Sequence, residues 1–510
     1  MKGGKPGNAQ DSTRLSLPLD CILMVTPALL LACSHGAICA ALMLRILSRR
    51  NPPGVSMAWI LLVLAVPVGG ALLYVMIGER RLGRRWIERA EAEHAVLAVL
   101  FARLASGAAV DPAVLGPAAE PTARLARALG GIDVMRGHRV ELFSESADIL
   151  QGLIDDIDAC RTHCSLEFYI WHHAGRVLNV IDALVRAAQR GVKVTILMDG
   201  LGSRPFTRSA GMHALHQAGV EVIVVRPVSA FRLAAARADL RNHRKLAVFD
   251  HHIAWTGSFN LADPVEFKRD AGVGPWIDAM VRIEGPSCAV LGAMTAAMAF
   301  LQQGPRGKDF GSRSEALERA ARGLDDRGPV ALQPFASGPG FAYQHVESVL
   351  LSAIYSARHE LILTTPYFAP GESIVMALRS AARRGVAVTL IVPLRCDSRL
   401  VQYASASYFS DLLAAGIRIE RFDGGLLHTK SMVVDGEFAV FGTVNMDLRS
   451  FHLNFELSTL IYDREVAERL LALQRSYLRR CKPLDARLWE GRGLGRRILE
   501  NAAQLASPLL

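Results

Sequence analysis

The chain has 510 residues, a formal net charge of +10 at pH 7 and a hydrophobic fraction of 51%. This length allows several domains with cores of their own and excludes a small scaffold held by disulfides or zinc. The eight cysteines form no C-x-x-C pair, so buried, reduced thiols are expected. The positive charge suits anionic lipid head groups or nucleic acid, and charge alone does not separate these partners.

The first 78 residues predict a membrane anchor. After an N-terminal tail over residues 1–20, the runs Cys21–Leu44 and Val55–Ile77 carry no charged side chain. Each run is long enough to cross about 30 Å of hydrocarbon as a helix. The alternative is a cleaved signal, which the second run disfavours. Eight basic residues flank the pair on the side of the termini and three lie in the loop, which favours a cytoplasmic C-terminal region.

Residues 79–130 predict an amphipathic or linker region, with Trp86 as a possible interfacial anchor. A first α/β domain is expected at 131–304, a polar linker at 305–335 and a second α/β domain at 336–510. The hydrophobic periodicity predicts the same element order in both domains: helices at 146–160 and 177–190 with strands at 164–171 and 192–198, then helices at 346–357 and 374–384 with strands at 360–365 and 386–392. We therefore predict an internal duplication, with two tandem α/β/α domains related by a pseudo-twofold axis.

One polar motif occurs once in each predicted domain. His243, Lys245 and Asp250 are spaced as are His428, Lys430 and Asp435. Each triplet is followed by a glycine, a hydroxyl residue and an asparagine; these are Gly257, Ser258 and Asn260, then Gly442, Thr443 and Asn445. The chain has only eight lysines, so a chance repeat is improbable. On a strand, the histidine and the lysine two residues later share one face.

Two histidines and two lysines that meet at a pseudo-twofold axis would form a cationic pocket suited to a phosphate. The lysines would neutralise the non-bridging oxygens, and Asn260 and Asn445 would donate hydrogen bonds to them, so no metal is required. One imidazole would attack phosphorus while the other protonates the leaving alcohol.

A nucleophilic imidazole needs its far nitrogen held by a carboxylate. Glu456 and Asp278 are the candidates, and their alternative role is surface salt bridging. Asp250 and Asp435 complete the two catalytic triplets, but they end apolar runs. They are expected to brace the strands and not to touch substrate.

These motifs resemble the phospholipase D superfamily and, within it, the bacterial cardiolipin synthases. The similar stretches are Arg241–Lys245, Val281–Pro286, Thr365–Phe368, Leu427–Lys430 and Gly442–Phe451, together with the N-terminal pair of apolar runs. The resemblance implies phosphatidyl transfer between two phosphatidylglycerol molecules, with release of glycerol and without metal or cofactor. It also implies a phosphatidyl-histidine intermediate on His243, with His428 as the general acid, in an enzyme of the bacterial inner membrane.

Three other functions stay open at this point. A phospholipase D or another phosphatidyltransferase would use the same pocket, because only the competition between water and alcohol separates hydrolysis from transfer. A phosphodiester nuclease would not need the apolar runs, and no run of interleaved aromatic and basic residues predicts nucleic-acid binding. A scaffold with a vestigial site is disfavoured because all four motif His and Lys residues are present.

Overall fold

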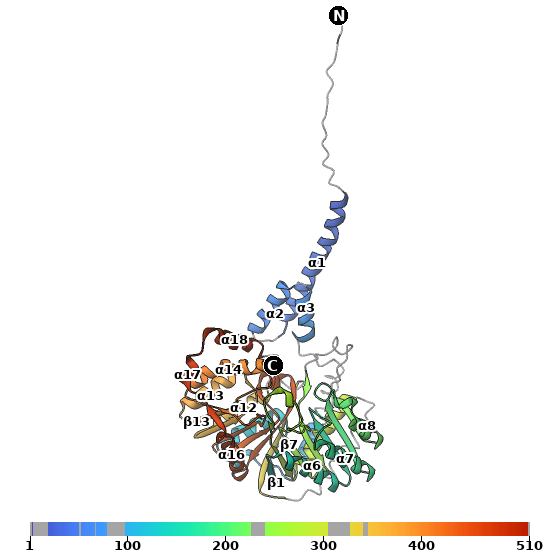
Figure 1. Cartoon of the computed structure of the whole chain (residues 1–510), viewed down its shortest axis with the longest axis vertical. Coiled ribbons are helices and arrows are strands. Elements are labelled where there is room, and N and C mark those ends of the chain that lie inside the picture. Colours follow the sequence, from blue (N-terminus) through green and yellow to red (C-terminus); the bar gives the residue numbers. More distant parts are fainter. Residues whose placement is uncertain are drawn as a thin grey trace. The chain divides into compact units, whose positions relative to one another are not determined.

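A computed structural model of the chain describes residues 3, 19–49, 53–66, 68–78, 97–225, 240–303, 327–339 and 345–507 (Figure 1). These residues fall into two compact units. The smaller unit holds the N-terminal helices up to residue 78, and the larger unit holds the described chain from residue 97 onward.

The N-terminal unit consists of helices α1 (Leu19–Leu47), α2 (Pro53–Ala65) and α3 (Gly69–Leu73), followed by the π-helix η1 (Tyr74–Gly78). The second predicted span is therefore interrupted between α2 and α3. The sequence has Pro67 at this point, and a proline cannot continue the helical hydrogen-bond ladder. Among the described residues, no helix combines the length and the apolar content that a bilayer crossing requires. The expected pair of transmembrane helices is thus not confirmed.

The region between the two units is described only in part. Residues 79–96, which include Trp86, lie outside the described residues, so most of the predicted amphipathic helix is not tested. Residues 97–105 are helical, and the short 3-10 helix η2 (Pro112–Leu115) and helix α5 (Glu120–Gly130) follow.

The larger unit contains the two predicted halves. The first half comprises β1 (Met135–Phe143), α6 (Ser146–Ala159), β2 (His163–Phe168), α7 (Val177–Gln189), β3 (Lys193–Asp199), η3 (Phe206–Arg208), α8 (Ala210–Gln217), β4 (Glu221–Val225), β5 (Arg241–Asn242), β6 (Lys245–Phe249), β7 (Ile253–Gly257), η4 (Arg269–Ala271), β8 (Trp276–Ile277), β9 (Met280–Glu284) and α10 (Ser287–Gln303).

The second half comprises β10 (Val330–Ser337), α12 (His345–Ser356), β11 (Glu360–Thr364), β12 (Phe368–Ala369), α13 (Glu372–Arg383), β13 (Ala387–Pro393), α14 (Arg399–Ala414), β14 (Arg418–Phe422), β15 (Leu426–Leu427), β16 (Ser431–Val434), β17 (Phe438–Gly442), β18 (Met446–Asp447), α15 (Leu448–His452), β19 (Asn454–Tyr462), α16 (Arg464–Leu478), β20 (Cys481–Pro483), α17 (Ala486–Glu490) and α18 (Leu494–Leu505). All eight helices and strands predicted from periodicity in the two halves are present, with boundaries shifted by at most three residues.

Local sequence explains why the repeated elements form. Helix α7 buries Val177, Val180, Ile181 and Leu184, which recur at the three- and four-residue spacing of one helix face. The helix ends at Gly191, whose φ of 87° is the left-handed conformation that glycine adopts most easily. Gly385 has a φ of 93° after α13, so both copies turn into their next strand in the same way.

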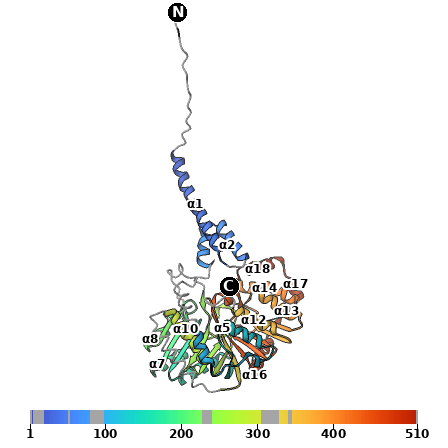
Figure 2. The same ribbon diagram turned by 180° about the vertical axis from the view of Figure 1, so that it is seen from behind.

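A single mixed sheet runs through both halves of the larger unit. Its strand order is β20-β14-β13-β11-β16-β17-β19-β10-β1-β9-β7-β6-β2-β3-β4. Apart from the edge strand β20, the order is symmetric about the antiparallel pair of β1 and β10. Figure 2 shows helices α7 and α8 beside the first half of this sheet and helices α12 to α14 beside the second. Strand β10 begins at Val330, inside the range 305–335 that was predicted as a linker.

Candidate active site

The two motif histidines lie where the halves exchange strands. The sequence predicted one strand through each motif, but β5 ends at Asn242 and β6 begins only at Lys245. In the gap, the backbone N–H of His243 donates to the carbonyl of Phe455 in the other half, at 2.9 Å. The N–H of His428 likewise donates to the carbonyl of Ile277, at 2.8 Å. Each histidine is therefore held against a strand of the opposite half.

The carboxylates are paired crosswise with the histidines. Nδ1 of His243 lies 2.9 Å from both carboxylate oxygens of Glu456, and Nδ1 of His428 lies 2.7 Å from Oδ1 of Asp278. Both carboxylates had been identified as candidates from the sequence, and both are buried. The parallel strand pairs β5·β19 and β8·β15 produce this crosswise pairing, because each pair aligns a histidine with the carboxylate of the other half. Each half is thus incomplete without the other.

The hydroxyl residues after each motif support these carboxylates. Thr443 Oγ1 donates to Glu456 at 2.5 Å and accepts from the backbone N–H of Leu457. Ser258 Oγ accepts from the backbone N–H of Ala279, beside Asp278. Asn454, which the sequence did not single out, donates its amide to Glu456 at 3.1 Å. These contacts orient the carboxylate–histidine pairs.

The two lysines occupy equivalent positions. Nζ of Lys245 donates to the carbonyl of His243 at 2.7 Å, and Nζ of Lys430 donates to the carbonyl of His428 at 2.5 Å. Both ammonium groups are buried, with residue exposures of 0% and 3%. An ammonium keeps further donors after one such bond, so each lysine can still bind an anionic oxygen.

Burial controls the charge of the titratable groups. It lowers the pKa of His243 and of His428 to about 4, with the lysines contributing to the lowering and the carboxylates opposing it. Burial also lowers the pKa of Lys245 to about 8. For Asp278, burial acts to raise the pKa, but His428 and Lys430 outweigh it and lower the pKa to about 2. At neutral pH the free site therefore holds neutral imidazoles, ionised carboxylates and a charged Lys245.

The asparagines that close each motif are buried near the histidines. Oδ1 of Asn260 accepts from the backbone N–H of Ile170 at 3.2 Å, which turns its amide nitrogen away from Ile170. Oδ1 of Asn445 makes no hydrogen bond to any described residue. Donation from these amides to a substrate oxygen stays a prediction.

The motif aspartates lie at the far ends of their strands. Asp250 accepts from the backbone N–H groups of Arg161, Thr162 and His163 at 2.7–2.9 Å, and from the hydroxyl of Thr162. Asp435 accepts in the same way from the backbone of residues 358–360. Burial would raise the pKa of Asp250, but these hydrogen bonds outweigh it and lower the pKa. Both aspartates tie a helix-to-strand turn to the motif strand, and neither belongs with the reacting groups.

We expect Asp250→Ala to lower the free energy of unfolding by about 2–4 kcal/mol, because several backbone N–H groups lose their acceptor. Asp435→Ala is the matched variant and should behave alike. Denaturant unfolding of the full chain measures the change, and turnover per folded molecule should stay within about threefold of the parent. A loss of turnover as large as that of a histidine variant would assign the aspartates to the chemistry.

Several site residues were missed by sequence reasoning. The ring of Tyr169 packs edge-on against His243 at 5.1 Å, and the ring of Trp276 packs against His428 at 4.5 Å. Arg244 is buried inside the motif and donates to the carbonyl of Glu456 at 3.2 Å. Tyr169 lies inside the strand predicted at 164–171, just after the observed β2 ends, and Trp276 lies two residues before Asp278. Neither position alone indicates contact with a histidine.

Among the described residues, no cluster of three or more His, Cys, Asp or Glu side chains is arranged to hold a metal ion. The motif lysines and the buried Arg244 supply cationic groups at this site.

The family model described as "Cardiolipin synthase, PLD-like domain" matches residues 153–267 and 350–475, and one described as "Phospholipase_D-nuclease N-terminal" matches residues 37–79. The chain is 39% identical over 487 residues to proteins named Cardiolipin synthase A in Escherichia coli strains SMS-3-5 and SE11, with 93% of this chain and 97% of each relative covered. A crystal structure of phosphatidylserine synthase from Haemophilus influenzae shares the fold, with a TM-score of 0.56, 15% identity, and coverage of 76% of this chain and 99% of that chain.

Proposed function

Since the chain belongs to the bacterial cardiolipin synthases of the phospholipase D superfamily, we propose that it transfers a phosphatidyl group from one phosphatidylglycerol to another. The products are cardiolipin and glycerol. The observation that carries this proposal is the pair of crossed histidine–carboxylate contacts beside two buried lysines.

In the first step, Nε2 of His243 attacks the phosphorus of phosphatidylglycerol. Glu456 accepts from Nδ1–H of His243, so the neutral ring carries its lone pair on Nε2. The bond from phosphorus to the glycerol oxygen breaks, and His428 supplies the proton to that oxygen. Glycerol leaves, and the phosphatidyl group stays bound to His243.

In the second step, a hydroxyl of another phosphatidylglycerol attacks the same phosphorus. His428, neutral after the first step, takes the proton of that hydroxyl, and Asp278 stabilises the resulting imidazolium. The phosphorus–nitrogen bond breaks, which frees His243 and releases cardiolipin. Lys245 and Lys430 neutralise the non-bridging oxygens in both steps.

The charges of the site suit a phosphodiester. Burial lowers the pKa of Lys430 well below its usual range, and a bound phosphate favours its charged form. With both lysines charged, two lysines and two carboxylates sum to zero, and one proton shared by the two histidines gives the occupied site a single positive charge. A phosphodiester carries one negative charge, and its entry raises the pKa of the nearby histidines. Substrate binding therefore favours the singly protonated state that the reaction requires.

We place the enzyme at the bacterial inner membrane, anchored by the apolar segments within residues 21–78, with the catalytic unit on the cytoplasmic side. The charge-free sequence of those segments and the distribution of flanking arginines support this location. Protease treatment of intact spheroplasts should leave the catalytic unit uncut, and cleavage there would place it on the other side.

The test is to incubate the purified full chain with radiolabelled phosphatidylglycerol and to identify the lipid products. Cardiolipin and glycerol in equal amounts are expected, with no loss of rate in EDTA. Phosphatidic acid as the sole lipid product would instead identify a hydrolase.

A further inference from the structure

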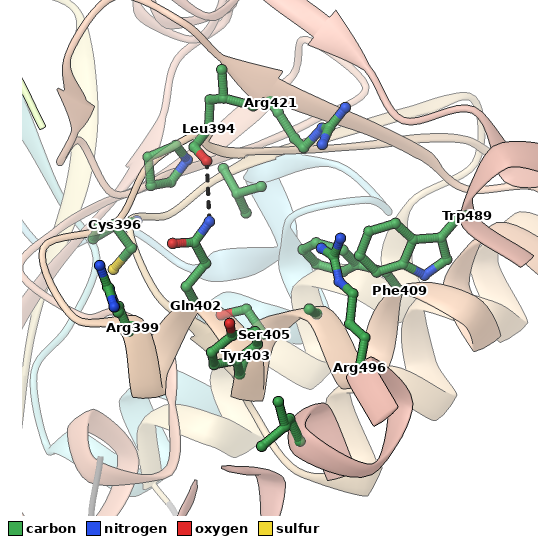
Figure 3. Close-up of a pocket in the computed structure, with 15 residues that line it drawn as sticks. Leu394, Cys396, Arg399, Gln402, Tyr403, Ser405, Phe409, Arg421, Trp489 and Arg496 are labelled. Atoms are coloured by element: carbon green, nitrogen blue, oxygen red, sulfur yellow. Dashed lines mark hydrogen bonds between the residues drawn. The ribbon is translucent and has the colours of Figure 1, made fainter. Parts of the chain in front are cut away.

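A second cationic pocket lies in the second half of the larger unit, away from the reacting histidines. It occupies about 480 Å³ beside the ends of β13 and β14 and is closed by α14, α17 and α18 (Figure 3). Three arginines line it, namely Arg399, Arg421 and Arg496, and no acidic side chain does. The pocket therefore favours an anion.

The positive charge of this pocket is not balanced by the residues around it. Arg421 is partly buried, and its Nε makes no hydrogen bond within the described part of the chain. Burial and the charge of Arg496 both lower the pKa of Arg421, so the two guanidinium groups repel each other. Arg496 does contact Glu500 at 3.0 Å, but Arg492 shares that carboxylate at 2.7 Å. A bound anion would relieve this repulsion.

The walls and rim of the pocket are apolar. Phe409 and Trp489 lie beside Arg496 (Figure 3), and Leu499 also lines the pocket. Around it, α18 exposes Leu494, Ile498 and Leu505, which are 73%, 58% and 85% exposed. The α17 side chain Leu488 and the α14 side chains Leu400 and Tyr403 are also exposed. Exposed apolar residues beside unbalanced arginines match a phospholipid, which presents a phosphate next to hydrocarbon.

Among the described residues, Arg421 has no counterpart in the first half. The strand pairings align Thr195 with Glu221 and Thr389 with Arg418, so the position equivalent to Arg421 is Val224. A groove present in both halves would be expected for phosphatidyl transfer, because both halves contribute to that reaction. A pocket lined by arginines of the second half indicates a separate role for that half.

The distance from the histidines limits what the bound phosphate can do. Arg421 is on β14, which two strands, β13 and β11, separate from β16 of the His428 motif. At about 4.8 Å per strand, the phosphate lies roughly 14 Å from that motif, farther than a three-carbon head group spans. The pocket is nevertheless connected to the active site. Its lining residue Pro366 precedes Tyr367, and the hydroxyl of Tyr367 donates to Asp397. His428 in turn contributes to the lowered pKa of Asp397.

We propose that this pocket is an accessory site for the phosphate of an anionic phospholipid, which does not itself react. It retains the second half of the catalytic unit at an anionic bilayer surface and raises the local supply of substrate. The proposal rests on the function proposed above only for the identity of the lipid.

The test compares Arg421→Gln with the parent in mixed micelles of detergent and phosphatidylglycerol at varied mole fraction. The half-saturating mole fraction should rise about five- to tenfold, as for the loss of one charge-assisted contact, with kcat within twofold. Arg418→Gln is the matched control on the same strand, because Arg418 contacts Thr389 outside the pocket. Arg496→Gln, at an exposed position, should reproduce the effect if Arg421→Gln folds poorly.

Binding is measured separately from turnover in the inactive His243→Ala protein, so that failure of the synthase assignment leaves the pocket testable. Native mass spectrometry with dioctanoyl phosphatidylglycerol should count one bound lipid fewer in His243→Ala/Arg421→Gln than in His243→Ala. An equal count, or an unchanged half-saturating mole fraction, overturns the proposal. Displacement of the lipid by an equal concentration of inorganic phosphate would instead identify a site for the free anion and overturn the lipid assignment.

Discussion

Alanine at His243 or at His428 is expected to lower the rate of cardiolipin formation by at least about 10³-fold, since each ring supplies a bond or a proton that no neighbouring group replaces. The double variant should be no slower than the slower single variant, because the two histidines act as one unit. The His243→Ala variant should fold, since Glu456 keeps its hydrogen bonds from Thr443 and Asn454, and circular dichroism checks the fold of both single variants. Labelled phosphatidylglycerol and product chromatography measure the rates.

The two histidines are distinguished by a substrate with a better leaving group. Phosphatidyl-p-nitrophenol releases a phenolate that needs no proton, so a general acid becomes dispensable for the first step. His428→Ala should then form a stoichiometric phosphatidyl-enzyme, seen as label on the protein and as a burst of p-nitrophenolate, whereas His243→Ala should form none. The reverse pattern would make His428 the nucleophile.

The crossed carboxylates give the second large effect. Glu456→Gln and Asp278→Asn are each expected to slow cardiolipin formation by about 10²- to 10⁴-fold, because an amide no longer fixes the tautomer or stabilises the imidazolium. Both substitutions keep the side-chain volume, so packing is preserved.

The pattern of these effects tests whether each carboxylate acts on the histidine of the other half. Glu456 lies in the second half but contacts His243, so Glu456→Gln should slow labelling by phosphatidyl-p-nitrophenol by about 10²- to 10⁴-fold. Asp278→Asn should label it, as His428→Ala does. If each carboxylate variant instead matched the histidine of its own half, the crossed pairing would not operate in solution.

The pH dependence has a defined sign. Protonation of the nucleophilic ring blocks attack, so the rate falls as the pH drops through the pKa of His243, which is about 4 in the free site. The negative charge of Glu456 raises the pKa of His243, so Glu456→Gln should move this acid limb to lower pH. The profile of kcat/KM for labelling by phosphatidyl-p-nitrophenol measures the shift. A shift to higher pH would show that Glu456 does not act on His243.

Patterns local in the sequence were sufficient to predict the duplicated halves. Apolar residues at helical spacing predicted α7 and α13, and Gly191 and Gly385 marked their ends, because these features depend on neighbours within one turn. The same logic failed at the motif itself, where one continuous strand was expected. Residues 241–243 instead bond to β19 of the other half, and β6 begins only at Lys245. The spacing of apolar residues along one segment does not report a hydrogen bond to the other half.

The sequence by itself identified the candidate groups of the site: the repeated His–Lys motifs, the amides after them and the two carboxylates. The tertiary structure decided which carboxylate serves which histidine, since the partners are 213 and 150 residues apart and meet only through β5·β19 and β8·β15. It also decided that the motif aspartates brace turns and that three arginines of the second half line one pocket. Residue types and spacing fix the available chemistry, but contacts between distant strands depend on how the two halves pack, and that packing is a property of the whole sheet.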